Sequence, residues 1–277
     1  MLITLVRLTA FGALVVFLAH CSSPKLASQW RDREIAIDGA DADWHDAKMH
    51  IEKTPVDIGV INDAEYLYIC LTSADRATQM QIARMGFTVW FDSGGGKSKK
   101  LGVRFPRGMR GPDMGSLRGL GRGGQPNPRQ LQALFDQLLL QGEMEILGPE
   151  KDQSRRLEVG GGAGLDVRVV YDRGRLVYEL RVPLVLGDFA LDKDGGSIVG
   201  IGFETAEPDR EEMRQRMGGG GLGGRPDGGL GGVGGDGRRP GGFGGGRGMG
   251  GGRGMGGGRA EPMQIWARIE LAAEPAQ

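Results

Sequence analysis

Reactive side chains are scarce in this chain of 277 residues, which has 2 cysteines and 3 histidines. They do not cluster at the spacings that zinc sites use, so we expect no metal centre. Cys70 lies within the stretch YLYICLT, where a cysteine more often packs as a small apolar residue than reacts. Catalytic motifs such as G-x-S-x-G and H-E-x-x-H are also missing. We therefore expect a protein that is not an enzyme.

An excess of charge of either sign is missing as well. The 35 lysines and arginines balance 35 aspartates and glutamates, which gives a formal net charge of +0. Proteins that bind nucleic acid gather positive charge, because contacts with phosphate supply much of the affinity. RGG-type tracts such as GGGRGMGGGRGM also occur in RNA-binding proteins. In an exported chain with balanced charge, however, we expect no nucleic-acid partner.

The apolar run near the N-terminus is too short to span a bilayer comfortably. This run, Leu8–Ala19, follows a single charged residue, Arg7, and is typical of an export signal. It ends in the sequence LAHC, which resembles the bacterial lipobox, where signal peptidase cuts before a cysteine that carries lipid. We expect residues 1–20 to be a lipoprotein signal peptide, Cys21 to be the lipidated residue and residues 21–33 to be a tether.

The residues around the lipobox-like sequence indicate the localisation of the protein. The sequence after Cys21, SSP, lacks the aspartate that retains such lipoproteins in the inner membrane. The resemblance therefore implies an outer-membrane lipoprotein of the cell envelope, facing the periplasm or the cell surface. His20 stands where lipoboxes carry a small residue, and an uncleaved N-terminal anchor is the alternative. If Cys21 is lipidated, Cys70 has no intramolecular disulfide partner.

Glycine, in contrast, is abundant, with 53 residues that are unevenly distributed. More than half of residues 217–259 are glycine, and such a segment cannot bury enough apolar surface to order itself. We predict a disordered loop there, followed by the final strand of the domain and a tail in residues 260–277. A second insertion, residues 94–142, combines glycine and arginine with one helix, so the main domain covers residues 34–216.

The remaining chain is rich in short segments of alternating apolar and polar residues. These segments have strand length, carry many β-branched and aromatic residues and are separated by turn residues, which predicts an all-β fold with antiparallel sheets. They are Val56–Ile61, Glu65–Thr72, Gly86–Asp92, Glu143–Leu147, Leu165–Asp172, Arg175–Leu184, Ser197–Thr205 and Met263–Leu271. Two helices are expected: an amphipathic helix over Asn127–Gln141, with an apolar face against the sheet, and a short charged helix from Asp209.

The sequence FTVWFDSGGGKSKK contains GGGKS, which invites comparison with a phosphate-binding loop. The pattern G-x-x-x-x-G-K-[ST] needs a glycine where this chain has Phe91, and it needs a helix after the loop. Here a short β-like run, Leu101–Phe105, follows instead. We therefore predict a hairpin turn between two strands.

Several of these segments together resemble a known family. The sequences IDGADADWHDA, DAEYLYICLTSAD, GFTVWFDSGGG, VYELRVPL and IVGIGFET are similar to motifs of the family 9 carbohydrate-binding modules and their DOMON-like relatives. The resemblance implies a jelly-roll-like β-sandwich. It does not fix the ligand, because these relatives include sugar binders and haem binders, and a fold does not determine function.

The resemblance also bears on cofactors. Haem is disfavoured, because an axial histidine would have to be His45 or His50, close to the opening motif. Family members can hold structural calcium in their loops, and a weak site would involve Asp92 or Asp194. We otherwise expect no cofactor.

Sugar recognition on a sandwich needs flat aromatic faces exposed on a sheet, with polar neighbours that fix the orientation. Alternation along the strands places four aromatic residues away from the predicted core, namely Trp90, Trp266, Tyr66 and Tyr68. We expect them to line one concave sheet face that binds a glycan or another flat ligand. The alternative is that they form cross-strand pairs or lie beneath the helix Asn127–Gln141.

Two functions follow from these features. The first is a non-catalytic envelope lipoprotein that binds a glycan or other ligand on an aromatic sheet face. The alternative is a structural or assembly lipoprotein that contacts envelope proteins through its glycine- and arginine-rich loops.

Overall fold

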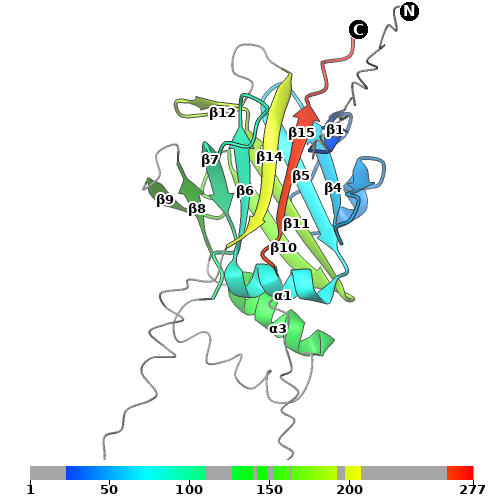
Figure 1. Ribbon diagram of the computed structural model, residues 1–277, viewed down its shortest axis with the longest axis vertical. Helices are drawn as coiled ribbons and strands as arrows, with labels where there is room; N and C mark the ends of the chain where they lie inside the picture. Colours follow the sequence, from blue (N-terminus) through cyan, green and yellow to red (C-terminus); the bar gives the residue numbers. More distant parts are fainter. Residues whose placement is uncertain are drawn as a thin grey trace, which may run out of the picture.

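The structure, a computed structural model, is a sandwich of two β-sheets with helices at one end (Figure 1). It describes residues 23–109, 127–139, 142–148, 153–162, 164–191, 197–206 and 261–276. The segments predicted as signal peptide, as charged helix from Asp209 and as glycine-rich loop lie outside these residues. The prediction of an all-β sandwich is confirmed.

The first sheet has seven strands. Neighbouring strands are antiparallel, except for the pair β1 and β15, which is parallel. Its strand order is β1 (Lys25–Ala27), β15 (Gln264–Glu270), β14 (Ile198–Thr205), β6 (Phe87–Asp92), β7 (Leu101–Arg104), β8 (Glu143–Leu147) and β9 (Ser154–Glu158).

The second sheet has six strands. Its order is β10 (Asp166–Asp172), β11 (Arg175–Pro183), β5 (Tyr66–Ser73), β4 (Asp57–Asn62) and β2 (Gln29–Trp30), with β3 (Lys48–His50) also paired to β4. A separate small hairpin joins β12 (Val185–Leu186) to β13 (Phe189–Ala190).

Period-two alternation explains how the sheets face each other. Successive side chains of a strand point to opposite sides, so apolar residues at every second position gather on one face. The inward set includes Leu67, Ile69 and Leu71 of β5 and Phe87, Val89 and Phe91 of β6, all of them fully buried. These residues form one continuous core between the two sheets.

The turn between β6 and β7 confirms the hairpin prediction for GGGKS. The Asp92 carboxylate accepts hydrogen bonds from the amides of Gly94 (3.0 Å) and Ser98 (2.8 Å) and pairs with Lys100 at 2.9 Å. The turn folds back over β14, where a Cβ at Gly200 would lie 2.1 Å from the carbonyl oxygen of Gly96. Only glycine allows this close approach.

Two helices cover one end of the sandwich (Figure 1). The predicted amphipathic helix is confirmed as α3 (Pro128–Leu139), whose Phe135 stacks on Tyr171 of β10 with ring centroids 5.6 Å apart. The other helix, α1 (Arg76–Met85), was missed by the sequence analysis. Its signals are local: Asp75 caps its first turn by accepting from the Thr78 amide at 2.7 Å, and Gly86 ends it with φ of 84°.

Residues 21–33, expected to be a tether, instead contain the two short strands β1 and β2. Leu26 is buried in the core, and the strands run parallel to β15 and β4 respectively. Between them, Ser28 bonds to the Asn62 side chain and donates its amide to the Glu270 carbonyl at 2.9 Å. The described part of the expected tether is therefore built into both sheets.

The opening motif is held against the outer face of the six-stranded sheet by one buried carboxylate. Glu179 of β11 is fully buried and accepts from the Trp44 indole (2.7 Å) and the Gly39 amide (2.5 Å). Trp44 ends the short 3-10 helix η1 (Asp41–Trp44) and is itself fully buried, above Cys70 and Tyr68. The segments IDGADADW and ELRVPL, which carry part of the resemblance, thus meet in space.

Burial sets the acid–base state of this region. It raises the pKa of Glu179 to about 7, although the two hydrogen-bond donors act in the opposite direction. Burial, followed by the charge of Glu179, raises the pKa of the Cys70 thiol well above its usual value. Cys70 therefore stays a protonated packing residue.

The chain leaves the described sheet at Ala206 and returns at Glu261. Thr205 donates its amide to the Met263 carbonyl at 3.0 Å, and Met263 donates its amide to the Thr205 hydroxyl at 2.9 Å. The final strand β15 then pairs with β14 along its length. The predicted return of the last strand to the sheet is confirmed.

Candidate ligand-binding face

Two of the four predicted aromatic residues lie together on the outer face of the seven-stranded sheet. Trp90 of β6 and Trp266 of β15 are both paired in register with Gly202 of β14, which lies between them. Their neighbours Val89, Phe91, Ile265 and Ala267 point inward to the core. The two indoles therefore share one row on the solvent side, and both are half-buried.

Each indole lies flat on a glycine. A Cβ at Gly202 would be 2.7 to 2.9 Å from three ring atoms of Trp266, and a Cβ at Gly102 of β7 would be 2.7 to 3.1 Å from three ring atoms of Trp90. Such similar distances to three ring atoms place the ring face, rather than its edge, above the glycine. The opposite face of each ring is consequently directed outward.

Polar groups surround the Trp90 indole. Its N–H donates to Glu204 of β14 at 2.8 Å, and the same carboxylate accepts from the Lys99 ammonium at 2.8 Å. The Lys99 nitrogen also lies 5.4 Å from the centre of the Trp90 ring. Among the described residues, the Trp266 indole N–H has no hydrogen-bond partner.

The row next to the tryptophans carries paired charges. Arg104 of β7 donates to Glu145 of β8 at 3.0 Å and to the Thr88 hydroxyl at 3.3 Å. On the other side of the tryptophan row, Asp92 is held by the hairpin turn and by Lys100. Burial raises the pKa of Asp92, but the amides of Ser98 and Gly94 together with Lys100 outweigh it and keep the pKa below its usual value.

Tyr66 and Tyr68 do not join the tryptophans, which corrects the prediction of one four-residue face. Both tyrosines are on β5, on the outer face of the opposite sheet, with ring centroids 6.2 Å apart. Alternation along a strand indicates which side chains leave the core, but not which sheet the strand joins. The two pairs therefore lie on opposite outer surfaces of the sandwich.

Tyr68 is a structural residue of that surface. It is buried, donates to Asp63 at 3.2 Å and accepts from Arg31 at 3.0 Å, while Arg31 pairs with Asp63 at 2.9 Å. Burial and then the Asp63 charge raise the pKa of the Tyr68 hydroxyl. Tyr66 remains half-buried, with the Arg181 guanidinium 5.3 Å from its ring centre.

The loops considered for calcium give no support for a site. Asp92 already accepts from two amides and Lys100, and Asp194 lies outside the described residues. No group of three or more His, Cys, Asp or Glu that could hold a metal ion is found in the described part of the chain.

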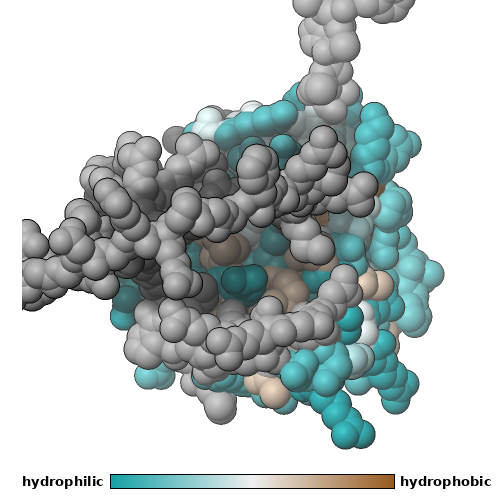
Figure 2. Space-filling model, turned by 60° about the horizontal axis from the view of Figure 1, so that its bottom comes forward, coloured by the Kyte–Doolittle hydropathy of each residue, from teal (hydrophilic) through white to brown (hydrophobic). Residues whose placement is uncertain are grey.

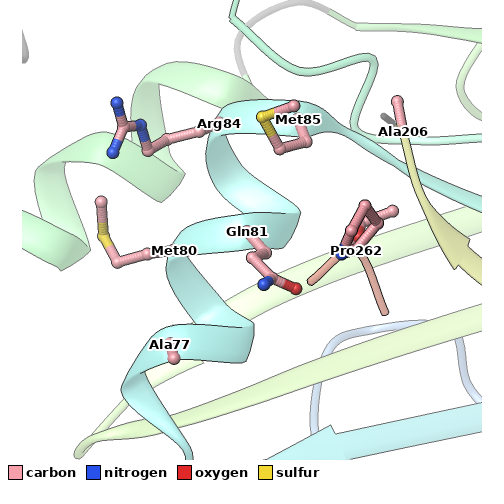
Figure 3. A pocket seen from close by; sticks show the side chains of 8 residues that line it. Ala77, Met80, Gln81, Arg84, Met85, Ala206 and Pro262 are labelled. Carbon is pink, nitrogen blue, oxygen red and sulfur yellow. The ribbon is translucent and has the colours of Figure 1, made fainter. Parts of the chain in front are cut away.

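A separate pocket of about 250 Å³ was not anticipated from the sequence. It lies between α1 and the ends of β14 and β15, at the helical end of the molecule, where Figure 2 shows a hollow with hydrophobic side chains among hydrophilic ones. The lining is formed by Ala77, Met80, Gln81, Arg84, Met85, Thr205, Ala206 and Pro262 (Figure 3). Among the described residues, its lining is mostly apolar, with Gln81, Arg84 and Thr205 as the polar members.

Membrane attachment is not visible in the described residues. Cys21 precedes them, and none of their helices combines the length and apolar character that a membrane crossing requires.

Comparisons with known proteins give structural similarity only. No family model and no curated protein sequence matches this chain. Two solved structures of a family 9 carbohydrate-binding module from Caldicellulosiruptor kristjanssonii are similar to it, one in complex with glucose and one with cellotriose. Both have 12% sequence identity and a TM-score of 0.32, and the similarity covers 68% of this chain and 80% or 78% of theirs.

Proposed function

We propose that this protein is a non-catalytic carbohydrate-binding protein that holds a glycan on the Trp90–Trp266 row. The observation that carries the proposal is that both indoles lie face-down on glycines in one row of the sheet, with their other faces outward. The C–H face of a pyranose ring stacks on such an aromatic surface.

The polar surroundings favour binding over catalysis. Glu204 and Glu145, two of the carboxylates that border the row, are each held by a cation, Lys99 and Arg104 respectively. Both carboxylates are thus already engaged in contacts within the protein. The same groups can accept hydrogen bonds from, and donate them to, sugar hydroxyls.

Titration calorimetry with glycans selected on a glycan array tests the proposal. Trp90→Ala and Trp266→Ala should each weaken binding by about tenfold or more, a loss of about 1.4 kcal/mol or more. Tyr66→Ala is the matched control, because it removes a half-buried aromatic ring from the opposite sheet and should leave the affinity unchanged. Wild-type protein that binds no glycan on the array would rule the function out.

We further propose that lipid on Cys21 anchors the domain at the bacterial cell envelope, in the outer membrane. The basis is the lipobox-like sequence LAHC at residues 18–21. Cys21→Ser should move the protein from the membrane fraction to the soluble periplasmic fraction and abolish labelling with a radioactive fatty acid. Cys70→Ser, which alters the buried thiol, should leave both unchanged. Persistent fatty-acid labelling of the Cys21→Ser protein would contradict the proposal.

A further inference from the structure

The tryptophan row is part of a longer apolar strip that crosses the strands. In register across β15, β14, β6, β7 and β8, the outward positions are Trp266, Gly202, Trp90, Gly102 and Leu147. None of the five carries a polar side-chain group except the indole N–H of the tryptophans. The strip thus presents a narrow path of apolar side chains perpendicular to the strand direction, with the Lys99 ammonium 5.4 Å from the centre of the Trp90 ring.

The path is flat because of its glycines. Trp266 extends from β15 over β14, and Trp90 extends from β6 over β7, so both rings lean in the same direction along the strip. Their points of origin are two strand spacings apart, roughly 9–10 Å. This separation is about the length of two linked pyranose rings.

Polar rows border the strip on both sides. One row consists of Gln264, Glu204, Thr88, Arg104 and Glu145, and the other contains Arg268, Gly200 and Asp92. Three of the acidic groups are neutralised within the protein, by the pairs Lys99–Glu204, Arg104–Glu145 and Lys100–Asp92. Because these charges are already paired, they can form hydrogen bonds with neutral hydroxyls along the edges of a ligand, whereas a strongly charged ligand would have to compete with the existing ion pairs.

In the described part of the chain, the strip is a row on the outer face of a sheet and is separate from the pocket at α1. The pocket at α1 contains neither tryptophan and lies at the helical end of the sandwich. A ligand on the strip is therefore contacted on one ring face and at its edges, and it can continue past both indoles.

From this geometry, and resting on the proposed function, we infer that the strip binds the internal rings of an extended, equatorially linked β-glycan that runs across the strands. In such a chain, alternate rings present the same face in nearly one plane, at a spacing that matches the two indoles. A chain with axial links curves away from a flat surface and would reach only one of them.

The experiment is a chain-length series measured by titration calorimetry. The probes are cello- and chito-oligosaccharides from the disaccharide to the hexasaccharide, each also with its reducing end converted to the alditol, and maltohexaose as the axially linked control. We expect at least one hexasaccharide to bind about tenfold or more tighter than its disaccharide. We also expect its affinity to be unchanged when its reducing end is converted to the alditol. Trp90→Ala or Trp266→Ala should reduce hexasaccharide binding to the disaccharide level, whereas Tyr66→Ala should not.

Three results would overturn the inference while leaving a glycan-binding function in place. They are equal affinity for disaccharide and hexasaccharide, loss of binding when the reducing end is blocked, and binding of maltohexaose as tight as that of the β-linked hexasaccharides. The same applies if neither β-linked series binds but the array identifies another glycan. Absence of binding to every glycan would instead refute the proposed function itself.

Discussion

Replacing Trp44 with alanine is expected to lower the free energy of unfolding by about 4 kcal/mol, the range found for deleting a large buried aromatic side chain. Trp44 is fully buried and packs over the outer face of β5. Its removal leaves a cavity and takes away one of the two donors that hold the buried Glu179. Urea denaturation monitored by circular dichroism measures the loss.

Trp266→Ala provides the matched control for Trp44→Ala. Trp266 is half-buried and keeps one ring face in solvent, so its loss should cost only about 1 kcal/mol. The two substitutions therefore separate the roles of the two tryptophans: Trp44→Ala lowers stability, and Trp266→Ala lowers glycan affinity in a folded protein. Equal losses of stability would contradict the anchoring role of Trp44.

The second large effect is a dependence of stability on pH that comes from Glu179. Its pKa is about 7 in the folded protein and about 4.5 in the unfolded chain, so the folded state binds the proton more tightly. The stabilisation is complete below pH 4.5, declines as the pH rises and is lost above pH 7. Ionisation of Glu179 should therefore cost the wild type about 3 kcal/mol between pH 4.5 and pH 8.

Glu179→Gln isolates this contribution, because the amide has similar size but does not ionise. The free energy of unfolding of both proteins is measured at pH 4.5 and at pH 8. Glutamine places an NH₂ group against one of the donors from Gly39 and Trp44, a cost that is the same at both pH values. The difference between the two proteins should thus shift by about 3 kcal/mol in favour of the variant at pH 8. A difference that does not change with pH would show that Glu179 does not titrate in this range.

Most strands of five or more residues could be predicted from the sequence, but β9 (Ser154–Glu158) was missed. Of the shorter strands, β7 was expected, as the run Leu101–Phe105. Alternation over β5, β6, β11 and β15 was long enough to show both strand type and core face. β1 and β2 have three and two residues, too few to establish a period. α1 was missed because half of its sequence, RATQMQIARM, is polar, and Ile82 and Ala83 are its only fully buried apolar residues.

The candidate site could be predicted in part. Alternation correctly predicted that Trp90 and Trp266 point away from the core. The pairing of β14 with both of their strands could not be predicted in this way, because it depends on contacts distant in sequence. One signal for the pairing was present in the strand IVGIGFET. A glycine within a strand marks a place where another group approaches closely. Here the hairpin turn packs against Gly200, and the Trp266 ring packs against Gly202. Tyr66 and Tyr68 carried no such signal and were grouped wrongly.

The hydrogen bonds between Thr205 and Met263 make the chain between Ala206 and Glu261 a natural point of attachment for foreign sequence. The two strands are already joined where this chain begins and ends, so the sandwich imposes no fixed length on it. Doubling the length of such a connection costs only about 0.6 kcal/mol in closure entropy. A fluorescent reporter or an affinity tag inserted there would be joined to the sandwich at the end of β14 and the start of β15, at the helical end (Figure 1), and would leave the pairing of these two strands in place.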